Sequence, residues 1–153
     1  MEIKEQKKLK FLGIEIPKVN FIAHQRLINK RLQINSVFKS KYMYSKQNPD
    51  MFSIVMDVNL NAENYFELTL TAIGHFKFGG EFISDEERKI LINANATAIM
   101  FPYIRTFITT FTSQLGQYLI EPLIIPIQFF KGELEEIITE SEPALQTENS
   151  IDN

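Results

Sequence analysis

Alternation of apolar and polar positions dominates the first half of the 153-residue chain, and it predicts β-strands. The first run, residues 11–21, is imperfect and is broken by Pro17, which predicts an edge strand or a bulged one. A second run covers residues 31–38. Residues 52–60 and 65–78 then alternate on either side of a short polar turn, and they predict an antiparallel hairpin.

The stretch between the second and third predicted strands, residues 39–50, has the composition of a long connection. It contains serines and lysines and ends in Asn48-Pro49-Asp50, which is a turn signal. Yet Tyr42, Met43 and Tyr44 are large for a solvated loop. We therefore expect these side chains to have a packing partner.

A long helix is predicted to begin at Ser84-Asp85-Glu86-Glu87. The serine and the glutamate three positions later form a capping box, and acids suit the positive end of the helix dipole. The helix should run to Leu115, with Gly116 as its C-terminal stop. Pro102 lies well inside it and is expected to kink or split it, because proline removes one backbone donor.

The two halves of this helix differ in their apolar pattern. The second half carries one stripe at spacings of three and four, formed by Met100, Ile104, Phe107, Ile108, Phe111 and Leu115. The first half, residues 90–99, is apolar around nearly its whole circumference, which one sheet cannot bury. This predicts a second apolar surface from another copy of the chain. The predicted oligomer interface consists of Ile92, Ala96, Ile99 and Tyr103.

The C-terminal part changes character twice. Residues 122–130 are apolar and contain two prolines, which favours an extended segment, and a short acidic helix is predicted from Glu133 to Glu140. The remaining residues are mostly polar and acidic, too poor in apolar side chains to fold. The sequence therefore predicts one domain over residues 1–139 and a disordered tail over residues 140–153.

Composition narrows the class of protein. A chain with 44% hydrophobic residues can bury an ordinary core, and a net charge of -3 argues against nucleic-acid binding. The absence of cysteine excludes disulfides, thiolate metal sites and thiol nucleophiles, and it fits a reducing compartment. No apolar signal follows Met1, and the long apolar helix is too polar for a bilayer. We expect a cytoplasmic protein without membrane insertion.

Candidate chemistry is sparse. His24 and His75 lie far apart in sequence without acids at metal-ligand spacing, so structural or surface roles are expected. Asp57 and Glu67 could face each other on adjacent strands, but they alternate with apolar positions as solvent-facing residues do. Arg105 is alone in an apolar helix and is expected to pair with a buried oxygen or to reach water at the kink. The sequence predicts no enzyme, no metal and no cofactor.

Three motifs occur in a family-specific order. They are Gly79-Gly80-Glu81-Phe82-Ile83 after the last strand, Phe101-Pro102-Tyr103-Ile104-Arg105 within the helix, and Pro126-Ile127-Gln128-Phe129 before the final helix. With these motifs, the chain resembles the SecB family of export chaperones over residues 10–138. The helix motif is the most specific of the three.

The resemblance implies an α+β fold, in which a four-stranded antiparallel sheet packs against a long kinked helix and a short C-terminal helix. It also implies a dimer of dimers, and hence a homotetramer. Members bind unfolded polypeptides, including precursors for export, in apolar grooves without ATP. The groove residues carried over by position are Leu32, Ile34, Phe38, Tyr42, Met43 and Tyr44.

The resemblance leaves two functions open. Export chaperones contact the motor ATPase of the secretion translocase through acidic residues on the first and last strands, where this chain has Lys18, Ile22 and His75. Relatives that serve as chaperones for an antitoxin in toxin-antitoxin operons share the fold and the groove. The chain is therefore expected to be a general holdase or a dedicated partner of an antitoxin.

Overall fold

The computed structural model describes residues 9–26, 33–79, 84–116 and 135–139 of the chain. The long strands are β1 (Leu9–Ala23), β2 (Asn35–Ser45), β3 (Asn48–Ala62) and β4 (Phe66–Phe78), and the remaining elements are α1 (Asp85–Ile90), a π-helical turn η2 (Leu91–Ala96), α2 (Thr97–Thr112) and a short strand β5 (Glu135–Thr139). The groove residue Leu32, the motif beginning at Pro126 and the tail 140–153 lie outside these ranges.

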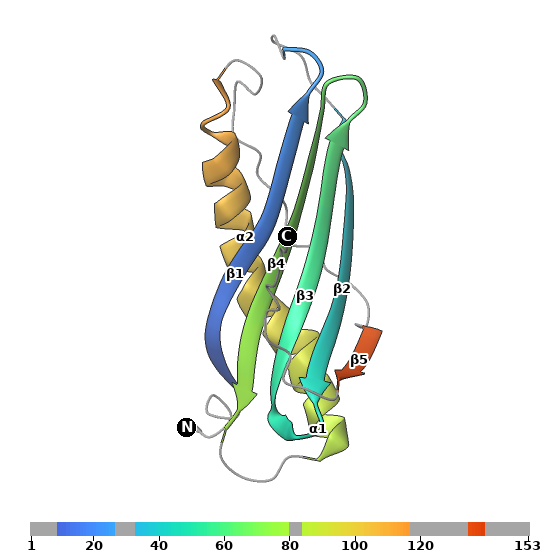
Figure 1. Cartoon of the computed structure of the whole chain (residues 1–153), viewed down its shortest axis with the longest axis vertical. Coiled ribbons are helices and arrows are strands. Elements are labelled where there is room, and N and C mark those ends of the chain that lie inside the picture. Colours follow the sequence, from blue (N-terminus) through green and yellow to red (C-terminus); the bar gives the residue numbers. More distant parts are fainter. Residues whose placement is uncertain (1–8, 27–32, 80–83, 117–134, 140–153) are drawn as a thin grey trace, which may run out of the picture.

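One sheet with strand order β1-β4-β3-β2-β5 forms the body of the molecule. The four long strands pair antiparallel, whereas β5 pairs parallel to β2. The continuous helical region from α1 to α2 crosses one face of the sheet, and no described helix or strand covers the opposite face, which we call the open face (Figure 1). The predicted α+β class, with a four-stranded antiparallel sheet and one long helix, is confirmed.

The core lies between the sheet and the helix. Alternate positions of β3 and β4 face the helix, as their period of two requires. The predicted helical stripe meets them: Met100, Ile104 and Ile108 are fully buried, and Phe107, Phe111 and Leu115 pack at its margin. The largest buried side chains of the sheet are Phe52, Ile54, Met56, Leu60, Phe66, Leu68 and Phe76.

Gly74 marks a close approach of helix and sheet. A Cβ atom added there would lie 2.8 Å from the sulfur of Met100, which is itself fully buried. Glycine at this position of β4 therefore lets the helix pack directly on the backbone of the strand.

The predicted edge strand is β1, and it is bulged. Its register with β4 shifts between Phe11 and Gly13 and again between Glu15 and Lys18, around Pro17. Gly13 has a φ of 137°, a backbone angle that residues other than glycine rarely adopt. Both features fit an edge strand, where a missing ladder donor is tolerated.

The predicted long connection over residues 39–50 is wrong. β2 continues through this stretch to Ser45, and β3 already begins at Asn48. The reason is that Tyr42 and Tyr44 keep the strand period and pack toward the helix, with Tyr42 only 7% exposed. A tight turn follows, in which the Ser45 hydroxyl accepts from the amide of Gln47 at 3.1 Å.

The predicted helix start is confirmed. The Ser84 side chain accepts from the amide of Glu87 at 3.2 Å. The helix does not split at Pro102, because α2 runs through that residue to Thr112; the irregular turn is η2, which precedes it. The helix ends at Thr112 with Ser113 as its C-cap, before the predicted end at Leu115, and Gly116, with a φ of 67°, lies in the turns that follow.

The predicted C-terminal helix over Glu133–Glu140 is wrong, since the described part of this segment is strand β5. Its glutamates favour a helix locally, but Ile137, Ile138 and Thr139 are β-branched and suit a strand. The free edge of β2 supplies the backbone partners that decide between the two.

Candidate functional site

A cavity of about 280 Å³ lies where the end of β2 meets the start of the helix. β2, β3 and β4 supply its aromatic side, and α1 with the first turn of η2 supplies its charged side. The lining residues are Tyr42, Tyr44, Phe52, Phe78, Asp85, Arg88, Lys89 and Ile92. We call this cavity the β2–α1 pocket.

Aromatic rings form the floor of the β2–α1 pocket. Tyr42 and Tyr44 are two positions apart on β2, so they share a face, and their rings stack at a centroid distance of 6.1 Å. Tyr42 also meets Phe52 edge-on at 6.5 Å, and Phe52 lies 4.9 Å from Phe78. Rings fixed in this way offer apolar area at little further entropic cost.

The rim of the pocket is mainly cationic. Arg88 donates from Nη1 to the carbonyl of Pro49 at 2.8 Å, and its guanidinium lies 4.7 Å from the centre of the Phe78 ring. These contacts fix the arginine between helix and sheet. Lys89 and Asp85 line the same rim and are exposed. The arrangement suits an apolar side chain inserted into the floor, with carbonyl or carboxylate groups near the rim.

The structure brings together part of the predicted groove. Tyr42 and Tyr44 line the pocket, and Phe38 lies further along the same face of β2, edge-on to Phe101 at 6.3 Å. Met43 alternates with the tyrosines and belongs to the opposite face of the sheet. Ile34 precedes β2 and is exposed.

Sequence reasoning missed the charged side of the pocket, Arg88 and Lys89. The capping box predicts that these residues occupy the first turns of the helix. The sequence pattern does not predict that these turns pack against the end of β2, because that packing depends on contacts between residues distant in sequence. A basic pair directly after a capping box is the signal that could have suggested them.

The orientation of the helix places two of the predicted oligomer-interface residues in the core and leaves the other two at least partly exposed. Ile92 and Ala96 belong to the core beneath the helix, with Ile92 only 3% exposed, so they cannot form an outer contact surface. Ile99 is partly buried, and Tyr103 is 49% exposed although its ring lies 5.0 Å from that of Phe11. The helix leaves Ile90 facing outward, 62% exposed.

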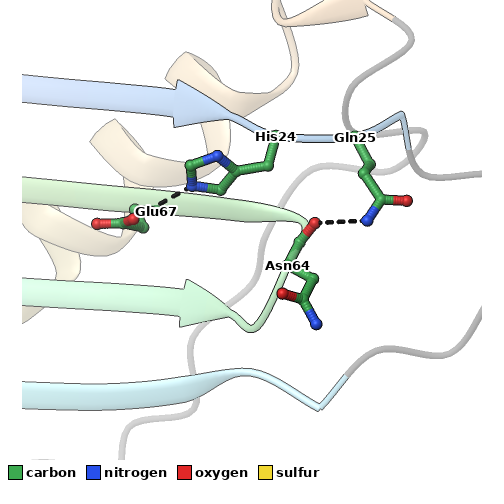
Figure 2. Close-up of polar contacts among 4 residues, drawn as sticks. All are labelled: His24, Gln25, Asn64 and Glu67. Carbon is green, nitrogen blue, oxygen red and sulfur yellow. Dashed lines mark hydrogen bonds and ion pairs between the residues drawn. The ribbon is translucent and has the colours of Figure 1, made fainter.

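Both histidines make contacts between strands on or near the open face. Nε2 of His24, just after β1, lies 3.2 Å from a carboxylate oxygen of Glu67 on β4, and the side-chain amide of Gln25 donates to the backbone carbonyl of Asn64 at 2.9 Å. Figure 2 shows both contacts. Asn64 has a φ of 70° in the turn between β3 and β4. These contacts join the end of β1 to that turn.

The second histidine forms a chain across three strands. His75 on β4 lies 2.8 Å from the hydroxyl of Ser53 through Nδ1 and 2.7 Å from Glu15 through Nε2. Although serine, histidine and glutamate occur together in hydrolases, Ser53 is 1% exposed, so its hydroxyl is not accessible to a substrate. The geometry favours a structural contact.

The remaining candidate groups are separated. Asp57 accepts from Thr71 at 2.7 Å, and its pairing register places it away from Glu67. Arg105 lies within α2 and is partly exposed. Within the described ranges, no group of three or more His, Asp or Glu residues could hold a metal ion.

A helix that crosses a bilayer needs about 20 predominantly apolar residues. Among the described helices, none is both long and apolar enough to cross a bilayer.

Comparison with known proteins supports the fold. No protein-family model matches the chain. It is 25% identical over 157 residues to the uncharacterized protein MJ0357 of Methanocaldococcus jannaschii, covering 97% of this chain and 98% of that protein. It is similar to the Rv1957 SecB-like chaperone of Mycobacterium tuberculosis, solved in complex with a ChAD peptide from the Rv1956 HigA1 antitoxin, with a TM-score of 0.66 and 15% identity over 81% of this chain and 93% of that chain. The chain therefore has a SecB-like fold.

Proposed function

We propose that the chain is an ATP-independent chaperone that binds unfolded polypeptides in the β2–α1 pocket and along the adjoining face of β2. The observation that carries this proposal is the fixed aromatic floor formed by Tyr42, Tyr44, Phe52 and Phe78. The SecB-like fold supports it. The proposed molecule is a cytoplasmic homotetramer without enzymatic activity.

The physical basis of binding is burial of apolar client side chains. One fully buried large side chain contributes about 1.5–3 kcal/mol, which alone gives weak affinity. Phe38 extends the apolar face of β2 beyond the pocket, so a longer client segment can use several such positions. Many weak contacts of this kind give affinity with low sequence specificity.

A second candidate function is that of a dedicated chaperone for a single partner, an antitoxin. It is favoured by the complex of the SecB-like chaperone Rv1957 with a peptide from an antitoxin. In this version the same pocket would recognise one segment of the partner, and the chain would act in gene control. Capture from lysate separates the two, because a holdase should retain many polypeptides and a dedicated chaperone a single one.

A role in export would also require contact with the motor ATPase of the secretion translocase. Lys18 and Ile22 are exposed on β1 where export chaperones carry acids, and His75 is engaged with Glu15. The proposal therefore does not include this contact.

Fluorescence anisotropy with a labelled, cysteine-free unfolded client tests the proposed site. Replacing Tyr44 with serine should weaken binding about tenfold, because loss of one aromatic anchor of about 1–2 kcal/mol is comparable to the 1.4 kcal/mol of a decade. The matched control is Tyr65→Ser, since Tyr65 also packs at the margin of the core but lies at the β3–β4 turn. Equal affinity of Tyr44→Ser and the parent would contradict the site, and a parent that binds no client would contradict the function.

A further inference from the structure

A short strand of the chain already occupies the edge of the sheet beside the pocket. β5 pairs parallel to β2, and its register runs from Lys41 opposite Glu135 to Ser45 opposite Thr139. Both pocket tyrosines, Tyr42 and Tyr44, lie within this paired stretch. Figure 1 shows β5 as a small arrow beside the end of β2.

The pairing of β5 is limited in extent. β5 has 5 residues against 11 in β2, and the ladder covers only Lys41–Ser45. Parallel pairs are slightly less stable per residue than antiparallel ones. Along Asn35–Ser40, the outer edge of β2 has no strand partner within the described residues. The edge therefore offers more backbone donors and acceptors than β5 uses.

The sequence of β5 indicates the chemistry that this edge accepts. It consists of two glutamates followed by two isoleucines and a threonine. Lys39 and Lys41 flank the edge on the open face of the sheet, and Arg88 and Lys89 form the rim of the pocket on the other face. Asp85 is the acidic exception on that rim. An extended segment with acids next to β-branched apolar residues fits these surroundings.

We infer that β5 is a resident strand, and that an extended client segment with acids next to β-branched apolar residues binds by displacing it and pairing with β2. This inference rests on the proposed function and adds a binding mode and a regulator to it. Backbone hydrogen bonds to β2 supply affinity for any extended chain, and the β2–α1 pocket selects its side chains. Occupancy by β5 lowers the apparent client affinity by the fraction of time the edge is covered.

A reversible disulfide between β2 and β5 tests the exchange in the full chain. The chain has no cysteine, so Lys41→Cys combined with Glu135→Cys introduces a single possible pair. These residues are direct partners in the ladder, which suits the Cα separation of about 4.4–6.8 Å that a disulfide needs. The probe is a labelled peptide with the sequence of residues 133–141 of this chain.

The reduced variant should bind the probe, and oxidation should weaken binding at least about tenfold, because a locked β5 removes the competent state. The matched control is the pair Lys10→Cys and Lys77→Cys, which links β1 to β4 at the opposite edge and should leave probe binding unchanged on oxidation. Of two probes carrying proline at the position of Ile137 or of Ile138, at least one should bind more weakly, because alternate amides of a strand donate to its partner and proline lacks this donor.

Two outcomes overturn the exchange: equal probe affinity in the oxidised and reduced states, or no probe binding in either. The unfolded client, measured in the same two states, separates this failure from failure of the proposed function. If Tyr44→Ser weakens client binding but oxidation does not change it, the client binds in the pocket without displacing β5. Should the cysteine pair disturb the fold, Ile137→Pro and Ile138→Pro in the full chain provide a second test, since at least one should tighten probe binding by freeing the edge.

Discussion

Ser53 carries a hydroxyl that is almost fully buried, although it lies on the face of the sheet opposite the helix. His75 lies 2.8 Å from it and extends the contact to Glu15 on the bulged edge strand. One imidazole thus joins β3, β4 and β1 on the open face. His24 makes a comparable contact with Glu67, but both side chains of this pair are exposed.

This difference predicts unequal effects of removing the two histidines. His75→Ala leaves the buried Ser53 hydroxyl without this partner and should lower the free energy of unfolding by about 1–3 kcal/mol. His24→Ala is the matched control and should cost less than about 1 kcal/mol, because a contact between two exposed side chains contributes little. Urea unfolding measures both. Equal losses would contradict the structural role of His75.

The close approach at Gly74 gives a second prediction. Gly74→Ala should destabilise the chain by about 1–3 kcal/mol, because the new methyl group meets Met100 in a filled core. In a Met100→Ala background the same substitution should cost little, since the obstructing side chain is gone. A double-mutant cycle by urea unfolding measures this coupling. Additive effects would show that the helix does not pack on Gly74 as described.

Among the helices and strands, the sequence pattern predicted the elements whose formation depends mainly on their own residues. Alternation located β1, β3 and β4 but only residues 35–38 of β2, Pro17 marked the bulged edge strand, and Ser84 marked the helix start. The predictions for two segments were wrong, and both for the same physical reason. The stretch around Tyr42 and the segment 135–139 both become strand because of a partner distant in sequence, which no local window contains.

The candidate site was also predictable only in part. Tyr42 and Tyr44 stood out as large side chains in a polar stretch, although they proved to be strand residues. The orientation of the helix was not predictable from its pattern. An apolar circumference does not say which side meets the sheet, and the structure assigns Ile92 to the core and Ile90 to the outside.

The helix start, which carries the charged side of the pocket, is capped by Ser84, and this cap should contribute to the stability of the chain. Ser84→Ala removes the acceptor for the Glu87 amide and should cost about 1 kcal/mol. Ser84→Asp is the matched control and should retain most of the stability, because aspartate also caps well. Thermal unfolding compares them. An unchanged midpoint for Ser84→Ala would show that this cap does not contribute.

At the scale of the whole molecule, the outward apolar residues of the helix predict self-association. Light scattering after gel filtration should give a mass near four times 17.8 kDa. Ile90→Asp should reduce that mass while the chain stays folded, because Ile90 is exposed in the single chain. Ile92→Asp should instead unfold the chain, since it places a charge in the core. A monomeric parent at micromolar concentration would contradict the interface.

Photo-crosslinking can show whether a bound client polypeptide contacts the β2–α1 pocket. A photoreactive amino acid replaces Lys89 on the pocket rim, and in a matched variant it replaces Lys77 on the open face of β4. Both side chains are exposed, so neither substitution should disturb the core. With a labelled unfolded client, crosslinks should form from position 89 and not from position 77. Crosslinks from position 77 alone would place the client on the open face and rule out binding at the β2–α1 pocket.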